Sequence, residues 1–238
     1  MRTGSGAGVS GWRLLLALVS WAALSGLLVL AVVLVARVVA PEWAAQHRAD
    51  LSAILIAGAY VALLTALLVS FGGPAGLRDR LGFRYTSLAD LAIALAVWFA
   101  ALIAGGVAEG ALAPLLGRPE SNAAGLLGRS FDPLFVGLVV PTVCLLAPAC
   151  EELLFRGALY GWLRRRVPAL VVMPVTAALF AAAHLLPPLI PLLFLFGLGA
   201  AWIRERTGST LNSFAMHATQ NTVAVAVTYV LLSHGGGR

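Results

Sequence analysis

Long apolar runs separated by short polar segments form the dominant pattern of this chain. A transmembrane α-helix needs about 20 consecutive, mostly apolar residues. Seven runs approach or exceed that length, at about residues 12–37, 51–71, 88–108, 133–150, 168–187, 189–203 and 209–233. The pattern predicts an all-α fold, a polytopic transmembrane helical bundle with about seven spans.

The amino-acid composition also indicates a membrane protein. Of the 238 residues, 61% are hydrophobic and 11% are charged, whereas about 25% are charged in an ordinary soluble domain. So few charges cannot form the polar surface that a water-soluble fold of this size requires. The formal net charge of +6 does not indicate a nucleic-acid partner, because no basic stripe with interleaved aromatic residues is present. The predicted surroundings are the lipid bilayer.

The arginine positions predict the orientation of the spans, because cytoplasmic loops of membrane proteins are enriched in basic residues. With seven spans, ten arginines fall on one side: Arg2, Arg13, Arg78, Arg80, Arg84, Arg164, Arg165, Arg166, Arg204 and Arg206. The other side receives Arg37, Arg48, Arg118, Arg129 and Arg238. We expect a protein of a bacterial cytoplasmic membrane with its N-terminus in the cytoplasm. The first apolar run is longer than that of a signal peptide, so we expect a retained anchor.

One compact membrane domain in two parts is the simplest organisation. Residues 1–129 are expected to hold about three amino-terminal spans and their loops, and residues 130–238 a catalytic core formed by the last four spans. Cys144 and Cys150 lack the CxxC spacing of a zinc or redox site. We therefore expect both cysteines to be buried free thiols.

Ionisable residues at membrane depth are costly and by default indicate function. Glu109 stands at the end of the third run, and we expect it at the membrane interface, outside the catalytic chemistry. The other candidates form three segments, Glu151-Glu152-Leu-Leu-Phe-Arg156, Phe180-Ala-Ala-Ala-His184 and His217-Ala-Thr-Gln-Asn221. These segments are the predicted functional site.

Helical geometry separates the two neighbouring glutamates. Glu152 and Arg156 are four residues apart and share a helix face, which favours an ion pair. Glu151 is rotated from Glu152 by about 100° and lacks that partner, so it is available as a general base. From this segment alone, a purely structural network of the three residues is an equally weighted alternative.

The histidines allow the same two interpretations. A single histidine in an apolar helix, such as His184, is more often a hydrogen-bonded core residue than a catalytic one. His217 and Asn221 are one helical turn apart, so both can direct an N–H group to one point. Two such donors are what a developing oxyanion needs.

The distances of these residues from the arginine-rich turns predict that they meet. Glu151 lies about 15 residues before the turn at 164–168, and His184 about 16 residues after it. Asn221 lies about 13 residues after the next such turn, at 204–208. At about 1.5 Å of rise per residue, these positions have similar heights in antiparallel helices. We expect the polar groups to form one layer inside the bilayer.

The three segments resemble the EExxxR, FxxxH and HxxxN motifs of the CPBP family of intramembrane proteases. This family includes the type II CAAX prenyl endopeptidases and the bacteriocin-processing, Abi-like proteins. The resemblance covers about residues 130–233. It implies an integral membrane endopeptidase that cleaves a peptide or a membrane-tethered protein. A prenylated substrate is not required by the resemblance.

The resemblance also implies roles for the motif residues. Glu151 and His184 would activate a water molecule that attacks the scissile carbonyl, and His217 and Asn221 would stabilise the oxyanion. In support, Glu152 would orient the site through Arg156, and Phe180 would pack beside His184; these seven residues are the predicted site.

Metal dependence is the open question of this mechanism. Zinc sites commonly use three protein ligands and a water molecule. If a divalent metal such as zinc is used, the implied ligands are Glu151, His184 and His217. We favour a glutamate-activated water without a metal, because no HExxH motif is present and zinc would leave Asn221 alone at the oxyanion.

Two other functions are compatible with polar groups in the membrane. A proton-coupled transporter could relay protons along Glu109, the glutamate pair and the histidines, although the sequence has no inverted repeat typical of transporters. A non-catalytic family member, for example in bacteriocin self-immunity, is the second alternative.

Overall fold

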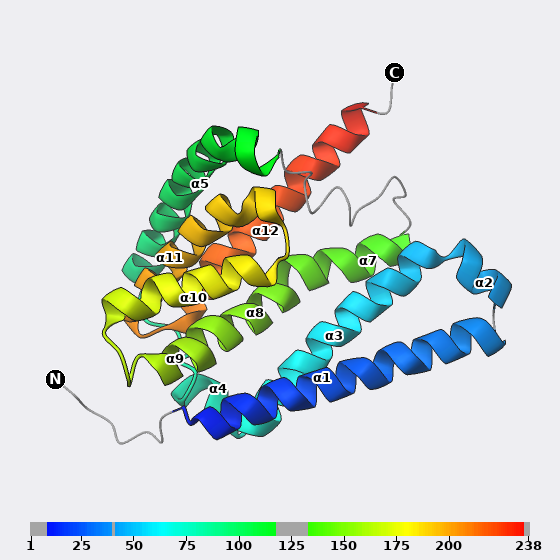
Figure 1. Ribbon diagram of the computed structural model, residues 1–238, viewed down its shortest axis with the longest axis horizontal. Helices are drawn as coiled ribbons and strands as arrows, with labels where there is room; N and C mark the ends of the chain where they lie inside the picture. Colours follow the sequence, from blue (N-terminus) through cyan, green and yellow to red (C-terminus); the bar gives the residue numbers. More distant parts are fainter. Residues whose placement is uncertain (1–8, 40, 118–132, 236–238) are drawn as a thin grey trace.

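The computed structural model of the chain describes residues 9–39, 41–117 and 133–235. These residues form helices and connecting turns, and no strand occurs among them (Figure 1). The predicted all-helical class is confirmed for this part of the chain. Arg2, Arg118, Arg129, Arg238 and the predicted boundary at 129/130 lie outside the described residues.

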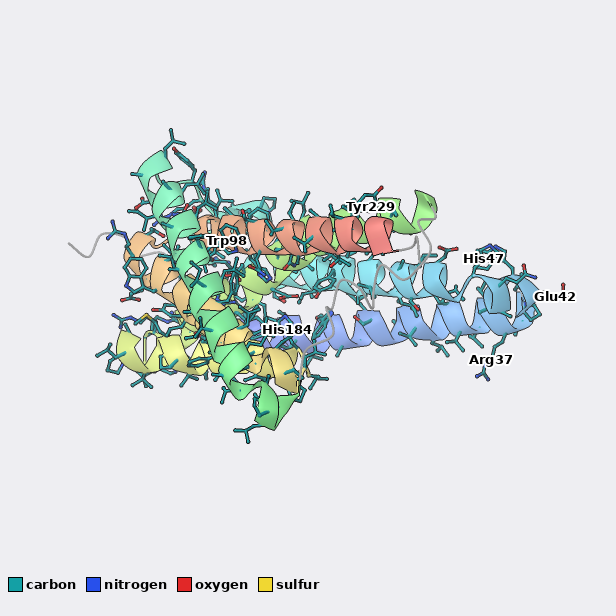
Figure 2. The ribbon with its side chains drawn as sticks, turned by 90° about the horizontal axis from the view of Figure 1, so that it is seen from above. Arg37, Glu42, His47, Trp98, His184 and Tyr229 are labelled. Atoms are coloured by element: carbon teal, nitrogen blue, oxygen red, sulfur yellow. The ribbon has the colours of Figure 1, made fainter. Side chains whose placement is uncertain are left out.

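The first two long helices form an antiparallel hairpin (Figure 1). Helix α1 (Gly11–Leu34) continues into a π-helical turn, η1 (Val35–Val39), and the short α2 (Pro41–Gln46) leads into α3 (Arg48–Phe71). The Ser10 side chain caps α1 by accepting a hydrogen bond from the Arg13 backbone N–H. Arg37, Glu42 and His47 lie at the tip of the hairpin, remote from His184 (Figure 2). The hairpin thus has an apolar body and a polar tip.

The next segment returns beside the hairpin and then leaves it. Gly72 ends α3 with a φ of 90°, a left-handed conformation that glycine adopts without steric cost. Helix α4 (Gly73–Asp79) is followed by a loop and by α5 (Leu88–Leu116). Ser87 caps α5 by accepting from the Asp90 backbone N–H. Helix α5 packs against α11 and α12, on the other side of the molecule from α1.

One long helical rod crosses the middle of the molecule (Figure 1). It consists of α7 (Pro133–Pro141), η2 (Thr142–Leu146), α8 (Ala147–Glu152), η3 (Leu153–Leu159) and α9 (Tyr160–Leu163). The prolines at 141 and 148 do not break it. Proline removes a backbone donor, and the π-helical turn η2 accommodates this loss, with the Ala147 N–H donating to the Thr142 carbonyl. Such π-turns occur frequently at functional sites.

The last helices close around this rod. Helix α10 (Ala169–Ala183) is joined through η4 (Pro187–Leu189) to α11 (Ile190–Thr207), and α12 (Thr210–Gly235) follows. Helices α10 and α11 pack against each other, and α12 contacts α8 and η2. Gly208 ends α11 with a φ of 66°, which turns the chain sharply into α12.

The predicted number of seven spans is not confirmed. Five helices among the described residues are long and apolar enough to cross a membrane: Gly11–Val39, Asp50–Phe71, Leu88–Leu116, Val136–Leu163 and Pro187–Thr207. Helix α10 has 15 residues, which reach about 22 Å and fall short of a hydrocarbon core of about 30 Å. Helix α12 is long enough but carries polar side chains along its first half. The polar residues of the predicted site, among them His217 and Asn221, reduce the mean hydropathy there.

The amino-terminal hairpin shares a core with the central rod. Its apolar cluster combines residues of α1, α3, the loop after α4 and the rod: Leu14, Ala17, Leu63, Leu67, Phe71, Leu81, Cys150, Leu153 and Ala158. The loop after α4 also reaches the start of α12, where the Thr210 backbone N–H donates to the Gly82 carbonyl at 2.8 Å. The first half of the chain therefore supports the helices that carry the motifs.

Candidate active site

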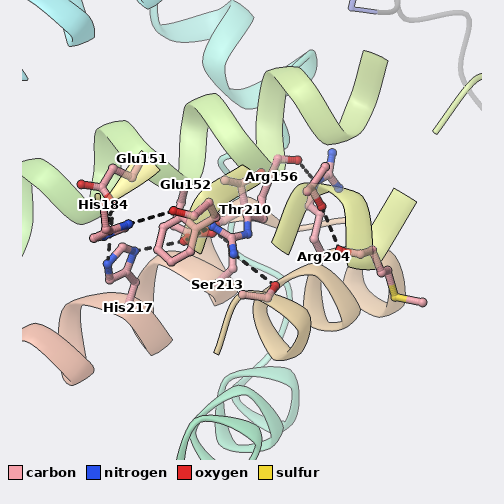
Figure 3. Close-up of polar contacts among 12 residues, drawn as sticks. Glu151, Glu152, Arg156, His184, Arg204, Thr210, Ser213 and His217 are labelled. Carbon is pink, nitrogen blue, oxygen red and sulfur yellow. Dashed lines mark hydrogen bonds and ion pairs between the residues drawn. The ribbon is translucent and has the colours of Figure 1, made fainter. Parts of the chain in front are cut away.

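Glu151 projects from α8 toward two histidines of other helices (Figure 3). Its Oε2 atom lies 3.9 Å from Nε2 of His184 and 3.9 Å from Nε2 of His217. Oε2 is buried and has no hydrogen-bond partner among the described residues. The other oxygen, Oε1, accepts a hydrogen bond from the Tyr60 hydroxyl at 2.6 Å. One carboxylate oxygen is thus held, and the other faces two imidazoles.

Glu152 binds a histidine as well as the arginine expected from its sequence position. Its Oε1 lies 3.0 Å from Nη1 of Arg156 and 3.0 Å from Nδ1 of His217. Glu152 and Arg156 are fully buried, and Nη2 of Arg156 donates to the Gly197 carbonyl at 3.1 Å. A buried carboxylate in contact with a guanidinium remains charged because the partner compensates its desolvation. The ion pair predicted from the spacing is present.

His184 stands at the carboxyl end of α10, where the helix stops before two prolines. Its Nδ1 lies 2.8 Å from the Phe180 carbonyl oxygen. The next residue, Leu185, has a φ of 55°, which is uncommon for a residue with a side chain and typical of strained functional turns. The turn directs the imidazole back toward α8.

Phe180 packs among the charged and polar groups of the site. Its ring centroid lies 4.7 Å from that of His184 and 5.6 Å from that of His217. The Arg156 guanidinium carbon lies 4.3 Å from the same centroid, a cation–π distance. Phe180 is fully buried, so its ring fills the space between the Arg156 guanidinium and the two imidazoles and contacts all three.

The hydrogen bonds of the two histidines determine where their protons lie. A carbonyl oxygen only accepts, so Nδ1 of His184 carries a proton. Nδ1 of His217 likewise donates to the Glu152 carboxylate. In the neutral forms, Nε2 of each ring therefore carries a lone pair that points toward Glu151. The site can accept protons from a water molecule at these atoms.

Asn221 lies one turn beyond His217 on α12 and turns toward the central rod. Its Nδ2 donates to the Val143 carbonyl at 2.9 Å, which uses one of its two N–H groups. The preceding residue, Gln220, accepts a hydrogen bond from Trp98 Nε1 at 2.7 Å, which ties α12 to α5. Asn221 therefore has a second N–H group for a ligand.

Two cavities meet at Glu151. The first, of about 320 Å³, is lined by the predicted polar residues Glu151, His184, His217 and Asn221, together with Tyr60, Gln220 and apolar side chains. The second, of about 730 Å³, lies among α1, α3, η3 and α10, and its walls are mostly aliphatic and aromatic. Ile56, Tyr60, Glu151 and His184 line both. A polar compartment thus adjoins a larger apolar one.

The arrangement of the side chains bears on the metal alternative. Within residues 9–39, 41–117 and 133–235, no group of three His, Cys, Asp or Glu side chains is arranged to hold a metal ion. In both His184 and His217, Nδ1 is hydrogen-bonded to an acceptor and Nε2 points toward Glu151. Histidines that bind metal ions commonly have the same arrangement.

Tyr60 is the site residue that the sequence analysis missed. It comes from the middle of α3, about ten residues from either end of the apolar run 51–71. Tyrosine in membrane helices is enriched at the interfaces. Its position in the middle of a span is therefore the sequence feature that could have identified Tyr60 as a site residue. Of the other predictions, Glu109 lies in α5 and lines neither cavity. Cys144 and Cys150 are buried free thiols, as predicted.

Comparison with known proteins agrees with the motif pattern. Residues 133–223 match the family model described as type II CAAX prenyl endopeptidase Rce1-like. The matched segment contains all three motifs, so the resemblance to the CPBP intramembrane proteases is confirmed. No curated protein and no solved structure matches the chain.

Proposed function

We propose that this integral membrane protein hydrolyses a peptide bond with a water molecule activated by Glu151 and His184, because residues 133–223 match the family model described as Rce1-like type II CAAX prenyl endopeptidase. The observation that carries the proposal is Oε2 of Glu151, which has no hydrogen-bond partner in the described part of the chain and faces two imidazoles at 3.9 Å inside a cavity. Burying a carboxylate oxygen without a partner is costly. A water molecule that donates a hydrogen bond to Oε2 of Glu151 removes this free-energy cost.

The distances suit a bridging water. A water oxygen at the ordinary hydrogen-bond length of about 2.8 Å can bind both Oε2 of Glu151 and Nε2 of His184, which are 3.9 Å apart. Glu151 accepts one proton of the water, and the second O–H donates to His184. The resulting hydroxide attacks the scissile carbonyl carbon, and the carbonyl π electrons move onto its oxygen. When the C–N bond breaks, the proton passes from Glu151 to the leaving amine.

His217 and Asn221 are the proposed oxyanion donors. Asn221 offers its second amide N–H group, and His217 offers Nε2–H when both ring nitrogens are protonated. The Glu152 carboxylate, 3.0 Å from Nδ1 of His217, stabilises that charged imidazole as the carboxylate of a catalytic triad does. Placing two such donors in a site sheltered from water is an effective way to stabilise an oxyanion.

The proposed substrate is a peptide or a membrane-tethered protein with an apolar segment beside the scissile bond. The cavity of about 730 Å³ with apolar walls adjoins the polar cavity at Glu151. One substrate can therefore place an apolar group in the larger, apolar cavity and its peptide bond in the polar cavity. We further propose a bacterial cytoplasmic membrane and a cytoplasmic N-terminus, on the arginine distribution.

The family match favours a protease over a proton-coupled transporter. The geometry supports the same choice, because Glu109 lines neither cavity and the polar groups of the site gather in one compartment. A proton relay instead requires polar groups that continue across the bilayer.

A cleavage assay tests the proposal. Purified protein in detergent is incubated with fluorogenic peptides, soluble or tethered to a lipid anchor, and new termini are identified by mass spectrometry. We expect cleavage by the wild type and by Glu109→Gln, and its loss in Glu151→Gln, which keeps the side-chain shape. Undiminished cleavage by Glu151→Gln would refute the mechanism, and proton-dependent solute uptake without any cleavage would support the transporter.

A further inference from the structure

The Tyr60 hydroxyl makes the hydrogen bond that fixes the Glu151 carboxylate. The O–O distance of 2.6 Å is typical of a hydroxyl that donates to a charged carboxylate. Tyr60 belongs to α3, which precedes the segment matched by the family model. None of the three motifs contains it.

This bond determines which carboxylate oxygen is available for chemistry. The terminal torsion of a glutamate side chain has a broad, roughly two-fold energy profile, so the carboxylate can rotate unless a neighbour holds one oxygen. Tyr60 occupies Oε1, and Oε2 then points to Nε2 of His184 and Nε2 of His217 at 3.9 Å each. Without the hydroxyl, no side chain among the described residues donates to Glu151.

The backbone around Tyr60 is held from both sides. The Cys150 thiol, adjacent to Glu151 in sequence, lies 3.4 Å from the Tyr60 carbonyl oxygen. Trp21 of α1 donates through Nε1 to the Ala59 carbonyl at 3.1 Å. Helix α3 is therefore connected to α8 and to α1 within one residue of the tyrosine, which limits movement of its hydroxyl relative to Glu151.

We propose that Tyr60 is a positioning residue for Glu151, through which the amino-terminal hairpin completes the active site. This inference rests on the proposed function, because it assigns a role in the orientation of the proposed base. Tyr60 acts through Glu151 and leaves the substrate contacts unchanged. The family-matched segment alone would thus have an incompletely oriented carboxylate.

The proposal predicts a loss of turnover without a loss of substrate binding. Tyr60→Phe keeps the ring that lines both cavities and removes only the hydroxyl. A hydrogen bond to a charged group typically contributes enough to change a rate by about 10- to 100-fold. We expect kcat to fall by that factor while KM stays within about twofold. Tyr85→Phe, at a side chain that is 61% exposed in the loop before α5, is the matched control and should keep both constants.

A conservative rescue separates positioning from a structural role. Incorporation of 4-aminophenylalanine at position 60 keeps a donor at the same place on the ring and is expected to restore most of the lost kcat. Detergent-solubilised thermal unfolding and size exclusion are measured on each variant. If Tyr60→Phe is recovered unfolded, the 4-aminophenylalanine protein still provides the test, because it must be active if the donor is what matters.

The outcomes distinguish this inference from the proposed function. Undiminished cleavage by Glu151→Gln would refute the proposed function itself. Loss of cleavage in Glu151→Gln together with wild-type kcat in Tyr60→Phe would overturn only the role of Tyr60. A raised KM at unchanged kcat, or no rescue by 4-aminophenylalanine, would also overturn it, because the ring or the fold would then be responsible.

Discussion

The Glu152 carboxylate contacts the His217 imidazole at 3.0 Å, between Oε1 and Nδ1, across 65 positions of sequence. The same oxygen contacts Arg156 at 3.0 Å. One buried oxygen therefore joins the structural ion pair to a histidine of the proposed oxyanion site. A change at Glu152 should affect both the stability and the chemistry of the protein.

Glu152→Gln is expected to destabilise the fold and to reduce cleavage. The substitution leaves the fully buried Arg156 without its charged partner, and breaking a buried pair in this way typically costs about 3–5 kcal/mol. It also removes the carboxylate that orients His217. The measurements are the denaturation midpoint in detergent and the cleavage rate at a temperature where the variant is folded.

Arg164→Gln is the matched control for this change. Arg164 pairs with Glu205 at 3.0 Å, but the two side chains are 43% and 32% exposed. Such a surface pair contributes less than about 1 kcal/mol, so the variant should unfold near the wild-type midpoint. Equal destabilisation by the two substitutions would contradict the assignment of the buried network.

Asn221→Asp tests the proposed oxyanion site. The aspartate keeps the shape of the side chain but has no N–H group, and loss of one oxyanion donor typically lowers kcat by about 100- to 1,000-fold. KM should change little, because the interaction develops in the transition state. Since the hydrogen bond to the Val143 carbonyl is also lost, the unfolding midpoint is measured in parallel. A folded variant with normal kcat would remove Asn221 from the mechanism.

Gly82→Ala is expected to disrupt the loop that supports the start of α12. Gly82 has a φ of 75°, and an added Cβ would lie 2.8 Å from the Gly208 carbonyl oxygen. Gly73 has a similar φ of 72° but no neighbour within 4 Å of such a Cβ. Gly73→Ala therefore carries only the conformational penalty, about 1–2 kcal/mol. The difference between the two unfolding midpoints measures the effect of the close contact between the added Cβ at position 82 and the Gly208 carbonyl oxygen. Equal midpoints would show that the loop can move away from Gly208.

Removal of metal ions is expected to leave the cleavage rate unchanged. The proposed reaction uses the Glu151 carboxylate as the base and has no step that requires a metal ion. The protein is dialysed against a chelator, its metal content is determined, and the rate is measured again. Loss of activity that returns with zinc would instead assign Glu151, His184 and His217 as ligands.

The sequence allowed the local features of the site to be predicted, because they depend on helical periodicity. The Glu152–Arg156 pair follows from a spacing of four residues, and the shared height of Glu151 and His184 follows from equal distances to one turn. The contact between Tyr60 and Glu151 spans 91 positions, and no periodicity connects an apolar helix with one particular partner. The second role of Glu152, at His217, was missed for the same reason.

The span count shows a different limit of sequence analysis. The apolar run at 168–187 predicts a span, but Pro187 and the turn after His184 end α10 at Ala183. The turn that shortens this helix also directs His184 into the site. In α12, the polar residues of the proposed site lower the mean hydropathy. The segments that form the proposed site are therefore the ones in which length and hydropathy predict spans poorly.

The most direct test of the central claim is a double-mutant cycle between Glu151→Gln and His184→Ala, measured as kcat for one cleaved peptide. Two residues that activate the same water act as a unit, so their effects should be strongly non-additive. We predict that each single variant loses most of the activity and that the double variant is hardly slower than the slower single one. Multiplicative losses, or cleavage that persists in Glu151→Gln, would contradict the account.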